Sequence, residues 1–180
     1  MTNPRITVYT VIDSPLGPLG LARTGLGLSR IRFLKEKNPQ PPPSWTRDDG
    51  AFSDATVQLR DFFSGKLRAF SLPLAPRGTA FQMRVWNQLK AIPYGQTISY
   101  GQLAQLVGKP SASRAVGAAN GRNPLPIVIP CHRVIGSDGS LTGYGGGVEI
   151  KKTLLELEVG VLNGGQPRPS ARISHRLHWS

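Results

Sequence analysis

Apolar and polar residues alternate along the beginning of the chain, which is the pattern of strands in an antiparallel sheet. Residues 5–12, 19–22 and 26–34 each show this alternation, and proline and glycine turns separate them. Residues 35–45 are rich in proline, which has no N–H to donate to a sheet. We therefore expect three strands followed by a loop.

A helical spacing begins after this loop. Ser53 stands at the position of an N-cap, Val57 and Phe62 are expected to share one face of the helix, and Gly65 is expected to end it. Together with the three strands, this helix predicts a small α+β domain over residues 1–76.

A second helix is predicted with Thr79 as its N-cap and an end before Pro93 and Gly95. Its apolar stripe, which we expect in the core, consists of Phe81, Val85, Trp86 and Leu89.

Two short helices joined by a glycine turn should come next, which is typical of a helix-turn-helix. Ser99 and Gln102 have the spacing of a capping box, so the first helix is expected over residues 100–107, with Gly108 after its last turn.

The second helix of this pair is slim. Ser111 is expected to cap it, residues 112–120 to form it and Gly121 to end it. Its only long polar side chain is Arg114, and its small residues are Ala112, Ser113, Ala115, Gly117, Ala118 and Ala119. Such a helix can enter a DNA minor groove, about 6 Å wide, or pack closely on another helix, and both alternatives stay open.

Positive charge is concentrated in the middle of the chain. The formal net charge is +12, and no acidic residue lies between Asp61 and Asp138, whereas nine lysines and arginines do. Such a segment favours binding of nucleic acid over a basic surface that serves only solubility. We expect a cytoplasmic protein, because no apolar run approaches about 18 residues and the first residues do not resemble a signal peptide.

Cys131 is the only cysteine, which excludes an intramolecular disulfide. The first 130 residues contain neither cysteine nor histidine, so we expect no metal site there. The apolar residues 127–129 predict a short buried strand that Pro130 ends just before the thiol.

A lone cysteine is usually an inert core residue. Here, however, His132 and Arg133 flank the thiol, and positive surroundings favour a thiolate. Glu158 falls on the apolar face of a helix predicted over residues 149–160, where a carboxylate needs a partner. Cys131, His132 and Glu158 therefore form a candidate relay, with a water between thiol and imidazole.

Residues 139–147 form a glycine-rich loop around Tyr144. It lacks the lysine and serine or threonine that end a phosphate-binding loop, so we interpret it as the wall of a pocket. Residues 161–180 are basic and polar, and we expect a flexible tail.

Three segments, "IPYGQTISYGQLAQLVGKPSASRAVGAANGRNP", "IVIPCHRVIG" and "LTGYGGG" with "LLELE", resemble the methylated-DNA–protein-cysteine methyltransferases, the O6-alkylguanine-DNA alkyltransferases. The resemblance is continuous over residues 79–160. It implies an α+β fold with a ribonuclease-H-like domain over residues 1–76, and a mainly helical winged-helix or helix-turn-helix domain over residues 77–160, before the tail at 161–180.

The resemblance also implies a function. Such a protein flips O6-alkylguanine, and also O4-alkylthymine, out of double-stranded DNA and transfers the alkyl group irreversibly to its own cysteine. It needs no cofactor, no membrane and no obligatory protein partner, and we expect a monomer.

Residue roles follow from the resemblance. Cys131 would accept the alkyl group, His132 would be the water-mediated base, and Glu158 would orient the histidine. Asn123 would brace the turn before the cysteine, and Tyr100 would crowd the phosphate and contact the guanine.

In the helix-turn-helix, Arg114 would enter the duplex from the minor groove, beside Ala112, Ser113 and Ala115. The pocket positions implied by the resemblance are Tyr144, Gly145 and the carbonyl of Val134. Some relatives carry serine at the position of Gly145, so a contact made here would come from the backbone N–H.

Two other functions compete with this one. A DNA-binding module would leave Cys131 idle, and the intact Pro-Cys-His-Arg-Val sequence argues against it. A cysteine hydrolase is disfavoured by the adjacency of Cys131 and His132 and by the basic segment.

Overall fold

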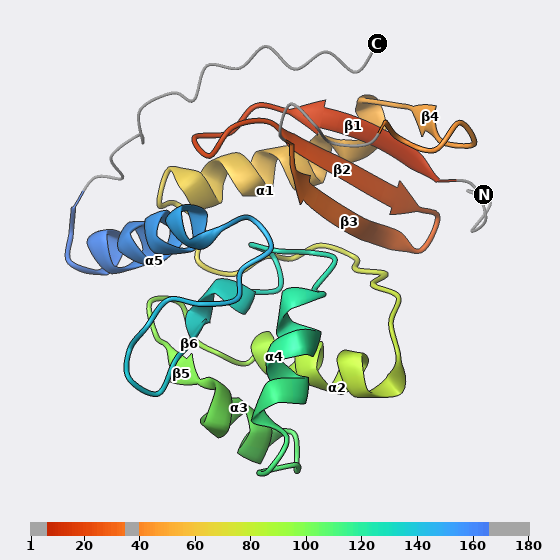
Figure 1. Ribbon diagram of the computed structural model, residues 1–180. Helices are drawn as coiled ribbons and strands as arrows, with labels where there is room; N and C mark the ends of the chain where they lie inside the picture. The colour runs from red at the N-terminus through yellow and green to blue at the C-terminus, as the bar shows by residue number, and fades with distance from the viewer. Residues whose placement is uncertain (1–6, 35–39, 166–180) are drawn as a thin grey trace. The chain divides into compact units, whose positions relative to one another are not determined.

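The computed structural model describes residues 7–34 and 40–165. The chain divides into two compact units, one ending at Pro76 and the other beginning at Arg77 (Figure 1).

A four-stranded sheet in the order β3-β2-β1-β4 forms the first unit. The three predicted strands are present: β1 (Val8–Ile12), β2 (Leu19–Thr24) and β3 (Gly27–Phe33), with antiparallel pairing of β1 with β2 and of β2 with β3. The additional strand β4 (Thr46–Arg47) runs parallel to β1. It was not predicted, because two residues are too few to show an alternation.

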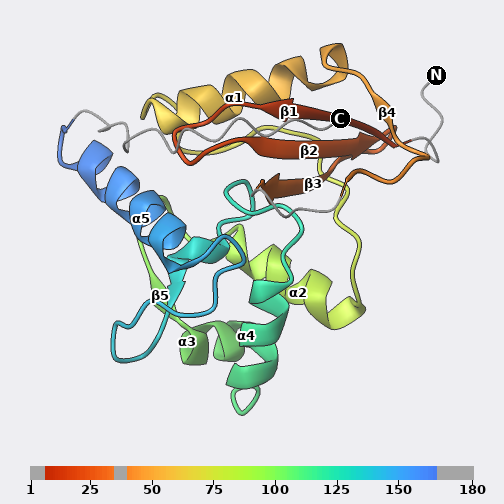
Figure 2. The same cartoon turned by 45° about the horizontal axis from the view of Figure 1, so that its top comes forward.

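Helix α1 (Ser53–Phe63) covers one face of this sheet (Figure 2). Ser53 was predicted as the N-cap of this helix but is its first residue. The Ser53 hydroxyl donates to the Gly50 carbonyl oxygen at 2.9 Å. The predicted shared face is also wrong, since Val57 is 43% exposed and Phe62 is fully buried. Residues five apart lie about 140° apart on a helix. Gly65 follows the helix with φ +75°, as expected for its end.

The second unit begins with α2 (Ala80–Leu89), whose capping box confirms Thr79 as the N-cap. The Thr79 hydroxyl accepts from the Gln82 N–H at 3.2 Å, and the Gln82 side chain accepts from the Thr79 N–H at 2.9 Å. The predicted core residues Val85, Trp86 and Leu89 are buried, whereas Phe81 is half-buried.

The helix-turn-helix consists of α3 (Tyr100–Leu106) and α4 (Ser113–Gly121). The capping box at the start of α3 is confirmed, and Gly108 has φ +74° after its end. The predicted cap Ser111 is wrong: the N-cap of α4 is Ala112, whose N–H instead closes the preceding turn onto the Lys109 carbonyl at 2.9 Å. Gly121 is the last residue of α4 itself, and the C-cap is Arg122.

The strand predicted at residues 127–129 is absent. These residues form turns, Ile127 has φ +75°, and the Ile129 N–H donates to the Leu125 carbonyl oxygen at 2.8 Å. The apolar run is buried, as a strand would be, but its backbone bonds close locally. A 3-10 turn (Cys131–Arg133) follows, and the strand β6 (Val134–Ile135) comes after the cysteine and runs parallel to β5 (Ile98–Ser99).

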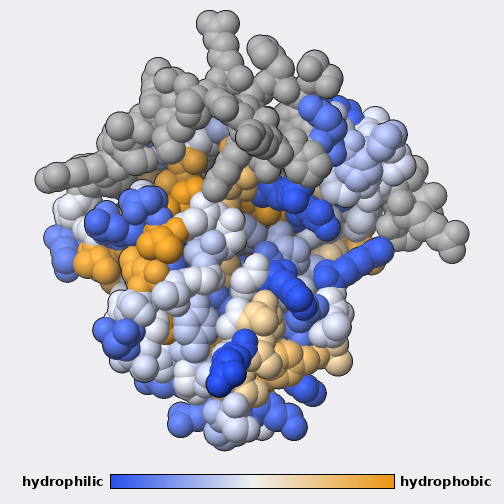
Figure 3. Space-filling model, viewed as in Figure 1, coloured by the Kyte–Doolittle hydropathy of each residue, from blue (hydrophilic) through white to orange (hydrophobic). Residues whose placement is uncertain are grey.

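The last helix, α5 (Val148–Leu162), includes the first two residues of the predicted tail, and residues 166–180 of that tail lie outside the described part of the chain. Within residues 7–34 and 40–165, no helix has the length and apolar character needed to cross a membrane. Figure 3 shows hydrophilic side chains spread over the visible surface of the helical unit.

Candidate active site

The predicted relay residues meet in the second unit, where the 3-10 turn at Cys131 contacts α5. Cys131 is buried, with 4% of its surface exposed. The Asn120 side-chain amide at the end of α4 donates to the Cys131 carbonyl oxygen at 3.3 Å. The cysteine is therefore held by its backbone, and its thiol is not part of a disulfide.

His132 and Glu158 are in direct contact, as the helical spacing of α5 predicted. His132 Nε2 lies 2.7 Å from Glu158 Oε1, and both side chains are fully buried. Burial lowers the pKa of His132, and the bond to Glu158 offsets this only in part. The imidazole is therefore neutral near pH 7, and we assign its proton to Nε2, which donates to the carboxylate.

The other imidazole nitrogen, His132 Nδ1, is buried and has no hydrogen-bond partner among the residues that the structure describes. With the proton on Nε2, Nδ1 carries a lone pair. A buried acceptor of this kind is suited to receive a proton from a water molecule.

Arg133 completes the site in a way that the sequence analysis did not predict. Its Nε and Nη2 donate to Glu158 at 3.0 and 2.9 Å, and its Nη1 donates to the Ile92 carbonyl oxygen at 2.6 Å. The Gly95 N–H is a further donor to Glu158, at 2.7 Å. Burial opposes ionisation of Glu158, but the bonds from His132 and Arg133 and the guanidinium charge hold its pKa below the ordinary value.

The expectation that positive neighbours keep Cys131 as a thiolate is wrong for this structure. Burial raises the pKa of Cys131 to about 11, and the lowering effects of Asn123 and of the Lys151 charge are smaller. The charge of Arg133 is directed to Glu158. The thiol therefore rests protonated and must lose its proton during any reaction.

Asn123 ties together the turn that precedes the cysteine. Its side-chain amide donates to the Ile129 carbonyl oxygen at 2.7 Å, and its side-chain oxygen accepts from the Leu125 N–H at 3.0 Å. Both bonds satisfy backbone groups that a strand would have paired otherwise. This position agrees with the brace that the resemblance implied.

Tyr100 and Lys151 converge on one carbonyl of the glycine-rich loop. The Tyr100 hydroxyl donates to the Thr142 carbonyl oxygen at 3.0 Å, and Lys151 Nζ donates to the same oxygen at 2.7 Å. Lys151 was missed by the sequence analysis, although it stands seven residues before Glu158 and so shares a face of α5 with it.

The predicted pocket residues lie on β6 and the loop after it. Val134 is fully buried in β6, and Tyr144 is half-buried. Burial raises the pKa of Tyr144 well above its ordinary value. Gly145 is exposed, and a Cβ there would lie 3.8 Å from the nearest atom, the Gly121 carbonyl oxygen. A side chain at this position would therefore fit.

Helix α4 has two different faces. Val116, Ala119 and Asn120 are buried, and Trp86 Nε1 donates to the Ala119 carbonyl oxygen at 2.9 Å. Arg114 and Ala115 are exposed, and Ala112 and Ser113 are half-buried. The two alternatives for the slim helix are therefore compatible, because it packs with one face and leaves the predicted DNA-contacting residues half-buried or exposed at its N-terminal end.

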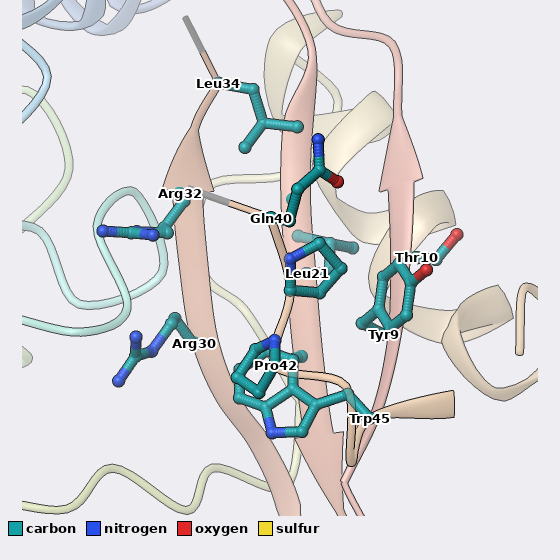
Figure 4. Close-up of a pocket in the computed structure, with 12 residues that line it drawn as sticks. Tyr9, Thr10, Leu21, Arg30, Arg32, Leu34, Gln40, Pro42 and Trp45 are labelled. Atoms are coloured by element: carbon teal, nitrogen blue, oxygen red, sulfur yellow. The ribbon is translucent and has the colours of Figure 1, made fainter. Parts of the chain in front are cut away.

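No group of three histidine, cysteine or acidic side chains able to hold a metal ion occurs in the described ranges 7–34 and 40–165. A cavity of about 50 Å³ lies on the sheet of the first unit, between the strands and residues 40–45 (Figure 4). Tyr9, Arg30, Arg32 and Trp45 are among its lining residues. None of the predicted site residues lines it.

Comparison with known families decides the relationship of the chain. Residues 7–76 match the ribonuclease-like domain of 6-O-methylguanine DNA methyltransferase, and residues 80–160 match its DNA-binding domain. The chain belongs to the 6-O-methylguanine DNA methyltransferase family. The family resemblance and the α+β fold class inferred from the sequence are thus confirmed.

Individual relatives agree with this family. The chain is 54% identical over 150 residues to the methylated-DNA–protein-cysteine methyltransferase of Mycobacterium bovis, a match that covers 83% of this chain and 91% of the relative. Identity to the enzyme of the same name from Methanosarcina acetivorans is 50% over 151 residues, covering 83% and 97%. The crystal structure of Mycobacterium tuberculosis OGT in complex with DNA superposes with a TM-score of 0.80 at 52% identity, covering 86% of this chain and 94% of that one.

Proposed function

We propose that this chain repairs O6-alkylguanine in double-stranded DNA by transferring the alkyl group irreversibly to Cys131. The observation that carries the proposal is the buried thiol next to a neutral His132, whose Nε2 binds Glu158 and whose Nδ1 is free to accept a proton. A protein with one nucleophilic thiol that ends as a thioether reacts once, since nothing in the reaction restores the thiol.

The chemistry begins with removal of the thiol proton. In our proposal a water molecule takes it from Cys131 and delivers a proton to His132 Nδ1, while Glu158 stabilises the imidazolium that results. The sulfur then forms a bond to the alkyl carbon as the bond between that carbon and guanine O6 breaks. The guanine leaves with a proton, for which the Tyr100 hydroxyl is the proposed donor.

Access to the alkyl carbon requires that the nucleotide leave the base stack, at a cost of a few kcal/mol. We propose that Arg114 enters the duplex from the minor groove and that Ala112, Ser113 and Ala115 allow α4 to approach it closely. Their half-buried or exposed positions at the N-terminal end of α4 support this arrangement. In the pocket, Tyr144, the Gly145 N–H and the Val134 carbonyl are proposed to contact the flipped guanine.

Several finer expectations belong to the same proposal. Residues 1–76 and 77–160 would act as the two domains and 161–180 as a flexible tail. We also propose that O4-alkylthymine is a substrate, that the protein acts as a monomer without a cofactor, and that it works in the cytoplasm on the cell's DNA.

Intact-mass measurement tests the proposal. After incubation with a duplex containing O6-methylguanine, the protein should gain one methyl mass, once, located at Cys131. The variant Cys131→Ser should gain nothing yet still bind the duplex. Repeated turnover, or loss of the lesion with Cys131 unmodified, would refute the proposal, and binding without any methyl gain would indicate a DNA-binding module.

A further inference from the structure

The Thr142 carbonyl oxygen accepts two hydrogen bonds from different elements. The Tyr100 hydroxyl at the start of α3 donates at 3.0 Å, and Lys151 Nζ in the first turns of α5 donates at 2.7 Å. Thr142 belongs to residues 136–147, which we call the pocket loop. One loop carbonyl is thus attached to both helices that border it.

Lys151 is placed unusually for a lysine. Its side chain is fully buried, whereas its neighbour Lys152 is exposed and pairs with Glu156 at 3.9 Å. A buried ammonium group requires partners to offset the loss of its hydration. The partners here are the Thr142 oxygen and the face of the Tyr100 ring, whose centroid lies 5.7 Å from Nζ.

Around Thr142 the pocket loop has little buried surface to hold it, although Tyr144 is half-buried and Gly146 is buried. Thr142, Gly143 and Gly145 are exposed. Gly143 has φ +65°, and a Cβ on it would lie 3.1 Å from the Tyr100 hydroxyl oxygen, so the loop backbone passes close to Tyr100. Polar bonds, rather than apolar packing, therefore hold this part of the loop.

The two bonds are not equivalent for the reaction. A tyrosine hydroxyl has a single proton, so Tyr100 cannot donate to Thr142 and to a guanine at the same time. Lys151 has three protons and no assigned contact with the substrate. When Tyr100 turns to the base, the Lys151 bond is the one that remains.

We propose that Lys151 is a positioning residue that holds the pocket loop by the Thr142 carbonyl, so that the loop keeps its place while Tyr100 exchanges Thr142 for the alkylated base. This proposal rests on the proposed function, since it assigns Tyr100 a contact with the guanine. It makes Lys151 responsible for the shape of the pocket and Tyr100 for the transfer.

Hydrogen exchange and single-turnover kinetics with free O6-benzylguanine test the proposal. In Lys151→Met, which keeps the length of the side chain but has no donor, amides of the pocket loop should exchange about tenfold faster or more. The apparent dissociation constant for the free base should rise by a similar factor, because the loop must first be ordered. Lys151→Arg, which keeps donors and charge, should recover most of both effects.

The matched control is Lys152→Met, which removes an exposed lysine one residue away and should change neither quantity. In Tyr100→Phe the limiting transfer rate should fall while loop exchange changes less than about threefold. Unchanged loop exchange and affinity in Lys151→Met would overturn the proposal. If that variant does not fold, fast loop exchange in Tyr100→Phe would overturn it equally, since Tyr100 would then be the residue that holds the loop.

Failure of this proposal is distinguishable from failure of the proposed function. The gain of one methyl group at Cys131 in the wild-type protein tests the function, and it does not depend on the proposed role of Lys151. Suppose that the wild-type protein gains one methyl group and that loop exchange in Lys151→Met is normal. This pair of results would support the repair function and exclude only the positioning role of Lys151.

Discussion

Replacing Glu158 by glutamine perturbs the site at its most connected residue. The Glu158 carboxylate is fully buried and accepts bonds from His132, from two nitrogens of Arg133 and from the Gly95 N–H. Glutamine has nearly the same shape but only one acceptor oxygen, and its amide group would face one of these donors. Arg133 would at the same time lose the only counter-charge that its nitrogens contact within the described residues.

The size of the effect follows from this geometry. Removing one partner of a buried ion pair typically costs about 3–5 kcal/mol, because the other charge stays buried and unpaired. Both Glu158 and the Arg133 side chain, which is 8% exposed, meet the condition of burial. We therefore expect Glu158→Gln to lower the free energy of unfolding by about 3–5 kcal/mol.

Urea titration followed by circular dichroism measures this change. The matched control is Glu156→Gln on the same helix, whose carboxylate is exposed and lies 3.9 Å from Lys152, and which should change stability by less than about 0.5 kcal/mol. A loss below about 1 kcal/mol in Glu158→Gln would refute the reasoning, since it would show that Arg133 does not depend on this carboxylate.

Three further predictions concern His132 and Arg114. Burial lowers the pKa of His132 in the folded protein, so the unfolded chain binds this proton at a higher pH than the folded protein does. The free energy of unfolding should therefore fall as pH drops below about 6.5, by at most about 1.4 kcal/mol per pH unit. In urea titrations at several pH values, a His132→Gln variant should lack this part of the pH dependence. The same variant should transfer the alkyl group about 10²- to 10⁴-fold more slowly in a quenched single-turnover assay with unchanged DNA affinity, and an unchanged rate would exclude His132 as the base. For Arg114→Ala we expect weaker duplex binding, with a salt dependence reduced by about one unit, and slower repair in duplex, but nearly normal reaction with free O6-benzylguanine; equal losses on both substrates would mean that Arg114 is structural.

Local features of the fold were predictable because they depend on residues close in sequence. The N-cap at Thr79 and the capping box at Ser99 formed as predicted, and a capping box, which is present at both positions, needs only a hydroxyl and a glutamine three residues later. The caps predicted at Ser53 and Ser111 failed, because a preceding turn used those positions. A serine before a helix is therefore a weaker signal than a complete capping box.

The contact of His132 with Glu158 was also predictable, since α5 presents Glu158 on the same face as the buried Leu154. The conformation before Cys131 was not. Residues 127–129 are buried in either conformation, so their apolar character does not distinguish a strand from a turn. Asn123 decides between them, because its side chain bonds the backbone of Leu125 and Ile129.

By itself, the sequence determined the candidate pair of Cys131 and His132, because one cysteine and one histidine in the first 174 residues leave no alternative, and helical spacing added Glu158 as the candidate carboxylate. Only the tertiary structure decided which group each positive side chain near Cys131 acts on. Arg133 stands next to His132 in the chain, yet its guanidinium is directed to Glu158, whereas Lys151, twenty residues away from Cys131, supplies the positive charge that acts on the thiol. Electrostatic effects depend on distance and burial in space, and neither quantity can be read from the order of residues.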